Sequence, residues 1–355
     1  MFYFTNEIVF AGHPDKICDR IADALLDAYM AEDCWTRAGI EVSGGKGKIF
    51  VTGEVTSQSE VDVEAVVKRV LKDVGYNPDR YEVINNLGKQ SPDIAAGVDD
   101  GGAGDQGVMF GFACSDTAKK LRTAQVILQD FANLYRQLCN KYPHDIFTDG
   151  KAQITGKYND DWELIEIKDF VISYHNSEEN RAFTDSLLQK MALTMCQNYN
   201  KKVTNFILNP AGKFEIGGFD ADAGMTGRKI VVDSYQGFSR VGGGAFSGKD
   251  PSKMDRSAAY KARQIAVRYL KDFNLKWCEV QIAYAIGIET PVSITIDSNQ
   301  GKITPKHELF IECKPKNIVN DLDLLCLKYE DEKALGHFTG NKPWDYYRSE
   351  ERFRR

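Results

Sequence analysis

Two hydrophobic periodicities alternate along this chain, and no other feature restricts its possible folds as strongly. Apolar residues recur at helical spacing over residues 17–28 and, more regularly, over residues 63–74, which predicts two amphipathic helices. Between them, residues 48–57 are rich in β-branched and aromatic side chains and alternate as a strand does. The alternation predicts an α+β or α/β fold in which several sheets share a central core.

The same order of elements returns twice further along the chain. Helices are predicted near residues 121–141, 180–199 and 256–272, and strands near residues 151–158, 164–174, 229–235, 278–287 and 292–297. A threefold unit of helix, strands and helix is one interpretation, although sequence similarity between the units is faint. At 355 residues the chain exceeds one hydrophobic core, so we expect two or three packed units.

The composition restricts the partners and the location of the protein. With 43% hydrophobic and 27% charged residues, it is that of an ordinary globular chain. A net charge of −6 argues against sequence-independent nucleic-acid binding, because such binding depends on Lys and Arg neutralising phosphates. The sequence has neither a signal-peptide pattern nor a run of 18 apolar residues, so we expect no membrane span and a cytoplasmic location. Eight singly scattered cysteines predict free thiols.

Five glycines fall between Gly97 and Gly107, a density that a packed helix or strand does not tolerate, because each glycine adds backbone entropy to the unfolded chain. Gly102 to Gly107 matches the G-x-G-x-x-G fingerprint of dinucleotide sites. That fingerprint requires a strand before it and a helix after it, whereas here a polar loop precedes and a strand-like segment at 108–113 follows. The stretch therefore predicts a functional loop rather than a dinucleotide fold.

A second glycine-rich stretch, residues 243–249, combines flexible backbone amides with positive charge. It satisfies G-x-x-x-x-G-K but continues with Asp250 and Pro251 where a P-loop has Ser or Thr. Lys253 lies four residues after Lys249, and Arg228 and Lys229 precede the glycine-rich stretch. These cations beside glycine-rich loops favour an anion site, and the alternative is a solvated basic surface.

Carboxylates and one histidine accompany these cations. Asp15 and Asp255 each lie at a predicted helix start, where an aspartate commonly caps the helix. Each could also bind Mg²⁺ beside a polyphosphate, because Mg²⁺ prefers hard oxygen ligands, and the two roles are compatible. His13 lies just before a proline in a glycine-flanked turn, where a structural role and a functional role both stay open.

Taken together, the motifs resemble those of the S-adenosylmethionine synthetase family. They stand in the family's order and cover nearly the whole chain, at residues 12–17, 88–94, 102–107, 224–229 and 242–260. The resemblance implies an α+β fold of three similar β-sheet-plus-helix domains about a pseudo-threefold axis. The implied bounds are residues 1–12 with 115–225, residues 13–114, and residues 226–355.

The resemblance also implies a reaction. In this family the methionine sulfur attacks C5′ of ATP and releases tripolyphosphate, which the same site hydrolyses to pyrophosphate and phosphate, with Mg²⁺ and K⁺ as cofactors. Sulfur is already a good nucleophile, so such a protein must only align the reactants and stabilise the charge of the leaving group. Two alternatives stay open: a Mg²⁺-dependent nucleotide or tripolyphosphate hydrolase, and a non-catalytic regulatory paralogue.

Site residues carry over from the family by position. The residues implied to act in catalysis, with His13 at the ATP oxygen next to C5′ and the cations on the tripolyphosphate, are His13, Lys151, Arg228, Lys229 and Lys249. Those implied to bind the rest of ATP are Asp149, Lys213, Phe214, Asp222 and Ala245. Those implied to bind methionine are Glu54, Gln90, Asp105, Asp222, Lys253 and Ile286. Those implied to bind metal are Glu7, Asp15 and Asp255 for Mg²⁺ and Glu41 for K⁺.

In the family the site lies between two subunits, which implies a homodimer and leaves a tetramer open. Glu41, Glu54 and Gln90 would then come from the partner of the chain that supplies His13 and Lys249. The sequence also departs from the family, mostly around the nucleoside, so nucleotide choice stays open. The departures are Ala11, Ser173–Asn176, Lys213 and Val241.

Overall fold

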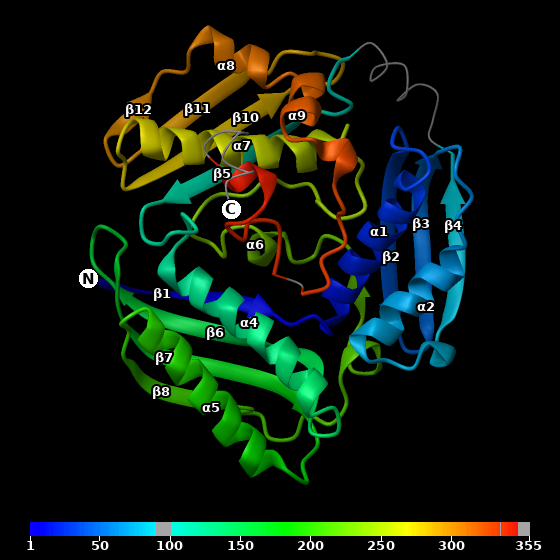
Figure 1. The fold of residues 1–355 in the computed structure, drawn as a ribbon, viewed down its shortest axis with the longest axis vertical. Coiled ribbons are helices and arrows are strands. Elements are labelled where there is room, and N and C mark those ends of the chain that lie inside the picture. The colour runs from blue at the N-terminus through cyan, green and yellow to red at the C-terminus, as the bar shows by residue number, and fades with distance from the viewer. Residues whose placement is uncertain (90–100, 334, 347–355) are drawn as a thin grey trace.

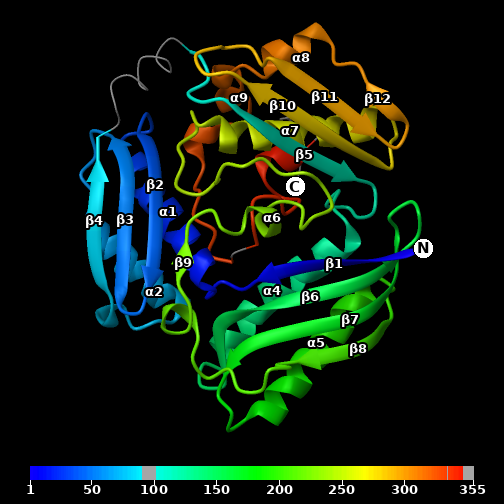
Figure 2. The same ribbon diagram turned by 180° about the vertical axis from the view of Figure 1, so that it is seen from behind.

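Three four-stranded sheets, each with helices on one face, surround the centre of the molecule in the computed structural model (Figures 1 and 2). The structure describes residues 1–89, 101–333 and 335–346. The short helix α6 (Ile230–Asp233) and the C-terminal end of the described chain lie in the middle, between the sheets (Figure 1). The predicted α+β fold of three sheet-plus-helix units is confirmed.

The β6 sheet has the strand order β1-β6-β7-β8. Its strands are β1 (Phe2–Val9), β6 (Ile146–Tyr158), β7 (Leu164–Asn176) and β8 (Val203–Leu208), and its helices are α4 (Thr123–Lys141) and α5 (Arg181–Asn198). Strand β8 runs parallel to β7, because α5 provides the crossover that a parallel connection needs. Apolar side chains of this sheet and its two helices form a buried cluster of their own.

The β3 sheet repeats this arrangement with the order β4-β3-β2-β9. Its strands are β2 (Arg37–Gly45), β3 (Lys48–Thr56), β4 (Glu82–Gly88) and β9 (Gly224–Met225), and its helices are α1 (Pro14–Met30) and α2 (Val63–Val74). The hairpin of β2 and β3 is antiparallel, and α2 then returns the chain to β4, which is parallel to β3. Hairpin, helix and parallel strand thus follow one another as in the β6 sheet.

The β10 sheet, with the order β12-β11-β10-β5, differs from the other two. Its strands are β5 (Gly107–Cys114), β10 (Trp277–Tyr284), β11 (Ser293–Ser298) and β12 (Gly301–Ile303), and its helices are α7 (Met254–Asp272), α8 (His307–Glu312) and α9 (Pro315–Asp321). All of its strand pairs are antiparallel, because no helix separates β11 from β12. Strands β5 and β9 join sheets built mainly from other parts of the chain, and the predicted domain bounds stay a prediction.

The strand predicted for residues 229–235 is wrong, because residues 230–233 form helix α6. Consecutive β-branched residues favour a strand only weakly when tertiary contacts oppose it. Here the helical turn brings Asp233 against α1, where the Lys16 Nζ atom lies 2.7 Å from the Asp233 carboxylate. The other predicted helices and strands are present, with shifted ends.

Helix α1 occupies a deeply buried position and carries the first part of the site. Ile17, Ile21 and Leu25 are fully buried in a cluster that joins the β3 and β10 sheets. The His13 side chain caps the helix, and Pro14 stands in the first turn, where its missing N–H leaves no bond unmade. The chain passes from β1 directly into α1, so this helix start lies beside the β6 sheet (Figure 1).

Two expectations from composition can be compared with the structure. All eight cysteine thiols are free, and most of them are buried. Among the helices in the described ranges, none combines the length and apolarity that a bilayer span requires.

Candidate functional site

His13 stands at a close approach of two segments. The Gly12 N–H donates to the Thr148 carbonyl at 2.9 Å, and a Cβ at Gly12 would lie 2.3 Å from the Thr148 Oγ1 atom, so only glycine fits. Burial, and then the charge of Lys229, lower the pKa of His13 from 6.5 to about 4. The imidazole is therefore neutral at pH 7. Its Nδ1 atom accepts from the Asp15 N–H at 3.2 Å, which leaves Nε2–H as a hydrogen-bond donor.

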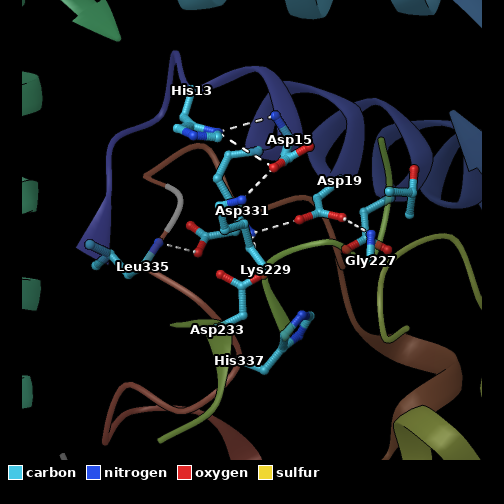
Figure 3. A network of polar contacts seen from close by, with 12 residues as sticks. His13, Asp15, Asp19, Gly227, Lys229, Asp233, Asp331, Leu335 and His337 are labelled. Atoms are coloured by element: carbon cyan, nitrogen blue, oxygen red, sulfur yellow. Dashed lines mark hydrogen bonds and ion pairs between the residues drawn. The ribbon is translucent and has the colours of Figure 1, made fainter. Parts of the chain in front are cut away.

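Asp15 binds the loop at residues 225–229 and does not cap α1, so the capping alternative is wrong for this residue. Its Oδ1 atom accepts from the Met225 N–H at 2.9 Å. Its Oδ2 atom lies 2.5 Å from the Lys229 Nζ atom (Figure 3). Burial is the largest influence on the Asp15 pKa and raises it, but the bonds from Lys229 and Met225 together outweigh burial and lower the pKa. Asp15 is thus an ionised carboxylate held between an amide and an ammonium group.

Two further cations belong to the same place. The Arg228 Nε atom lies 3.7 Å from Asp15, and the positive charge of Lys151 in β6 is close enough to help lower the His13 pKa. We call His13, Asp15, Lys151, Arg228 and Lys229 the α1 cluster. It joins one helix start, one strand and one loop around a neutral imidazole.

A second group of charged residues surrounds the start of α7. The Lys249 Nζ atom lies 2.5 Å from Asp255, and the Lys253 Nζ atom lies 3.0 Å from Asp250. Lys253 is the N-cap residue, so the capping alternative is wrong for Asp255 as well. A Cβ at Gly244 would lie 2.0 Å from the Asp255 carboxyl carbon, so the glycine-rich loop packs directly on this carboxylate. We call Lys249, Asp250, Lys253 and Asp255 the α7 cluster.

The loops of the two clusters touch. Gly227 has a φ of +79°, and a Cβ there would lie 2.6 Å from the Cβ atom of Ala245. The loop of Arg228 and Lys229 therefore lies against the glycine-rich loop that ends in Lys249. Cations that are far apart in the sequence thus face one region of the molecule.

The residues expected around the nucleoside lie next to the α1 cluster. Asp149 is buried and accepts from the N–H groups of Gly150 at 2.6 Å and Gly218 at 2.7 Å, and burial raises its pKa to about 6. The Phe214 ring stacks on His175, with ring centroids 5.5 Å apart and planes 25° apart. His175 is one of the departures from the family, so this departure contacts the ring expected to bind adenine. Asp222, whose charge helps raise the Asp149 pKa, is exposed.

Lys213, the remaining residue expected at ATP, points to solvent. Its side chain is 75% exposed and pairs with Glu215 at 3.6 Å. Glu54 lies opposite Gly39 in the β2–β3 hairpin, and Gly39 pairs on its other side with Lys249, so strand β2 separates Glu54 from Lys249.

Other residues expected in the site lie elsewhere in the monomer. Glu7 is in β1, and Glu41 is on the exposed face of β2, opposite Thr52. Asp105 and Ile286 lie at the same end of the β10 sheet, where the Gly287 N–H donates to the Ala103 carbonyl at 2.8 Å. Within the described residues, none of these four makes a hydrogen bond or ion pair with either cluster. Gln90 lies outside the described residues.

Lys16 is a charged residue at this site that sequence reasoning missed. Its Nζ atom lies 3.1 Å from Asp19 and 2.7 Å from Asp233. Burial is the largest influence and lowers the Lys16 pKa, but the two carboxylates outweigh it and raise the pKa above its usual value. The only sequence signal was the position of Lys16 directly after Asp15, on a helix expected to be amphipathic.

The described residues do not by themselves provide a complete set of metal ligands. In the part of the chain that the structure describes, no three His, Cys, Asp or Glu side chains gather as metal ligands would. Asp15 and Asp255 are single carboxylates, each beside a lysine. Such a donor set fits an ion that takes most of its ligands from a bound polyphosphate and from water, as Mg²⁺ does.

Models of three successive domains of one protein family match the chain. The S-adenosylmethionine synthetase N-terminal domain matches residues 1–92, the central domain matches residues 100–214, and the C-terminal domain matches residues 216–346.

Curated relatives and a solved structure agree with these matches. The S-adenosylmethionine synthase of Prochlorococcus marinus (strain MIT 9211) is 39% identical over 97% of this chain and 96% of its own length. That of Fusobacterium nucleatum is 36% identical over 97% of this chain and 95% of its own length. The structure described as an unusual S-adenosylmethionine synthetase from Campylobacter jejuni superposes with a TM-score of 0.89 at 31% identity, and covers 99% of both chains.

Proposed function

The chain belongs to the S-adenosylmethionine synthetase family, and on this premise we propose that the α1 and α7 clusters together bind the polyphosphate of ATP. The enzyme transfers the adenosyl group of ATP to methionine. The methionine sulfur attacks C5′, the C5′–O bond breaks, and the tripolyphosphate that leaves is hydrolysed to pyrophosphate and phosphate. The observation that supports this assignment best is the convergence of Lys151, Lys229 and a neutral His13 at the start of α1.

His13 would act on the bond that breaks. A neutral imidazole with its Nε2–H free can donate to the oxygen that leaves C5′, where negative charge develops. Burial and the nearby lysines keep the pKa of His13 low, so this donor form persists throughout the neutral pH range.

The cations of both clusters would stabilise the leaving group. In the structure, Lys229 and Lys249 pair with Asp15 and Asp255, and bound polyphosphate would share these lysines. Arg228, more than half exposed, is placed to bind phosphate oxygens from outside. Preorganised positive charge of this kind stabilises a transition state in which charge accumulates on the departing oxygens.

Metal ions would complete the polyphosphate end of the site. Asp15 and Asp255, together with Glu7 of β1, would hold Mg²⁺, and Glu41 would hold K⁺. When bound, Mg²⁺ neutralises charge on the phosphate oxygens. The supporting observation is the donor set, which over residues 1–89, 101–333 and 335–346 offers separate hard carboxylates and no group of three metal-ligating side chains.

The methionine end would come from a second subunit. Glu41, Glu54 and Gln90 would come from a partner copy, and Asp105, Asp222, Lys253 and Ile286 would also bind methionine. The open face of the β3 sheet supports a homodimer, because it exposes Phe50 (44%) and Met225 (46%), which a monomer would leave in water.

A subunit-mixing experiment tests the shared site. We expect Lys249→Ala and Glu54→Ala chains to be inactive separately, and to regain activity when mixed, because a mixed dimer contains one site with neither substitution. Lack of recovery in a mixture shown by mass photometry to contain dimers would refute a site shared in this way.

Product analysis tests the reaction. Purified protein with ATP, methionine, Mg²⁺ and K⁺ should yield S-adenosylmethionine, pyrophosphate and phosphate by mass spectrometry. ADP and phosphate as the only products would support the hydrolase alternative. We further propose a cytoplasmic location, in keeping with the free thiols.

A further inference from the structure

Helix α1 carries an aspartate at every fourth position: Asp15, Asp19, Asp23 and Asp27. Residues four apart lie on one face of an α-helix, so the four carboxylates form a stripe, which we call the aspartate ladder. The stripe faces the protein interior, since Asp15, Asp19 and Asp23 are 2%, 4% and 3% exposed. A buried stripe of carboxylates is unfavourable unless each carboxylate is bonded.

Each carboxylate of the ladder accepts a backbone N–H from a different position in the chain. Asp19 accepts from the Gly227 N–H at 2.9 Å (Figure 3). This bond lies one helical turn after the bond between Asp15 and Met225. Asp23 accepts from Gly248 at 2.9 Å. Asp15 and Asp19 therefore hold the loop that carries Arg228 and Lys229, and Asp23 holds the loop that carries Lys249.

The second oxygen of these three aspartates binds a cation. Asp15 binds Lys229, Asp19 binds Lys16 at 3.1 Å, and Asp23 binds Arg256 at 2.8 Å. Hydrogen bonds to a charged acceptor are shorter and stronger than neutral ones. Each of these three carboxylates therefore joins a backbone N–H of one segment to a cation.

Asp27 differs from the other three aspartates of the ladder in the partners of its carboxylate. Its two oxygens accept from the N–H groups of Tyr329 at 2.8 Å and Glu330 at 2.9 Å, and no salt bridge joins it to a cation in the described residues. The segment it holds carries no residue of the proposed site. Asp27 thus makes the same kind of bond from the same face of the same helix, but to a loop outside the site.

We propose that Asp19 and Asp23 are positioning residues, which fix the two cation loops at successive turns of α1 so that Lys229 and Lys249 face the same polyphosphate. Neither residue touches substrate in this account; each acts through a backbone amide. The proposal rests on the proposed function of the two lysines. Successive aspartates of the ladder are about 6 Å apart along the helix axis. A longer side chain at one of these positions would therefore displace the loop that it holds relative to the loop held by the next aspartate.

The test lengthens one aspartate side chain of the ladder by a methylene group and keeps its carboxylate. Asp19→Glu keeps a carboxylate for Lys16 but moves it by one methylene, and Asp27→Glu is the matched control on the same stripe. We expect Asp19→Glu to lower kcat/KM for ATP about tenfold or more and to slow hydrolysis of added tripolyphosphate, with KM for methionine within twofold of the wild type. Asp23→Glu should do the same through Lys249. Misplacement of catalytic groups by a fraction of an ångström to an ångström has effects of this order.

Asp27→Glu should leave both activities within twofold of the wild type, whatever it does to the melting temperature. Asp19→Asn, whose amide oxygen can still accept from Gly227, should recover part of the ATP affinity lost in Asp19→Ala. The positioning role is overturned if Asp19→Glu and Asp27→Glu behave alike, or if KM for methionine rises as much as KM for ATP. A wild type that makes no S-adenosylmethionine in the same assay would instead refute the proposed function.

Discussion

Helices α1 and α2 cover the same sheet but use their polar residues in opposite ways. In α2 the apolar residues are buried, and the polar ones face water, where Lys68 and Glu64 form an exposed ion pair at 2.7 Å. In α1 nearly every residue is buried, and Asp15, Asp19 and Asp23 bind the loops that carry the lysines of the candidate site. The comparison teaches that an aspartate at helical spacing acquires a site function only when neighbouring elements cover the helix on its polar side.

The strongest test of this difference is Asp23→Ala. It would leave Arg256, which is 1% exposed, as an uncompensated buried charge, and we expect a loss of about 3–5 kcal/mol in the free energy of unfolding. Urea unfolding followed by circular dichroism measures it. A loss below about 1 kcal/mol would mean that the buried stripe of α1 is energetically no different from the surface of α2.

Lys249→Ala should separate activity from stability. Lys249 is 23% exposed on its side chain, so its removal should leave the fold intact, whereas loss of one charge-stabilising group typically slows catalysis by about 10²–10³-fold. Steady-state turnover of ATP with methionine measures the effect. Lys68→Ala on α2 also removes a lysine that is paired with a carboxylate, at 2.7 Å, and the turnover of this variant should match the wild type.

His13→Asn should change the pH dependence of stability. Asparagine also caps a helix, so the substitution removes the titration but keeps the bond to the Asp15 N–H. Since the His13 pKa is lowered from 6.5 to about 4, its neutral form contributes stability that is complete above pH 6.5 and is lost as pH falls towards 4.

We expect the wild type to lose about 3 kcal/mol more than His13→Asn between pH 7 and pH 4, as the shift in pKa implies. Thermal unfolding at a series of pH values measures the difference, and parallel curves would contradict the buried neutral imidazole. The same variant should slow adenosyl transfer while tripolyphosphate hydrolysis is comparatively preserved, because His13 is proposed to act on the C5′–O bond alone.

The smallest effect is expected on α2. Lys68→Ala breaks an ion pair whose partners are 37% and 58% exposed, and exposed pairs contribute about 0–1 kcal/mol. Urea unfolding should give a change within that range. A larger loss would show that surface pairs on this fold are as important as the buried ladder, which would weaken the contrast drawn between the two helices.

Much of the fold could be predicted from local patterns. The apolar spacing of α1 and α2 and the alternation in β3 predicted elements of the correct type. Edge strands such as β4 and β8 were missed, because their side chains are only partly buried and carry little alternation. The error at α6 has another cause: residues 230–232 are β-branched, and only the contact between Asp233 and Lys16 explains the helical turn.

The candidate site could be predicted only as a set of residue types. The charged residues at Asp15, Lys229, Lys249 and Asp255 were identified from their motifs, but their pairing into two clusters was not. Asp19 and Asp23 were missed altogether, because a charged residue at every fourth position of an amphipathic helix usually marks its solvated face. Nothing local distinguishes that face from a buried one.

The sequence by itself determined the periodicities, the places of the glycines and the chemical groups available, since these depend only on which residues are neighbours along the chain. Tertiary structure alone decided which charged side chains are buried, which loops lie against each other, and that the His13 imidazole is neutral with its proton on Nε2. Those properties depend on desolvation and on distances between segments that are far apart in the sequence, such as Asp15 and Lys229, which are 214 residues apart. They exist only once the three sheets have enclosed α1.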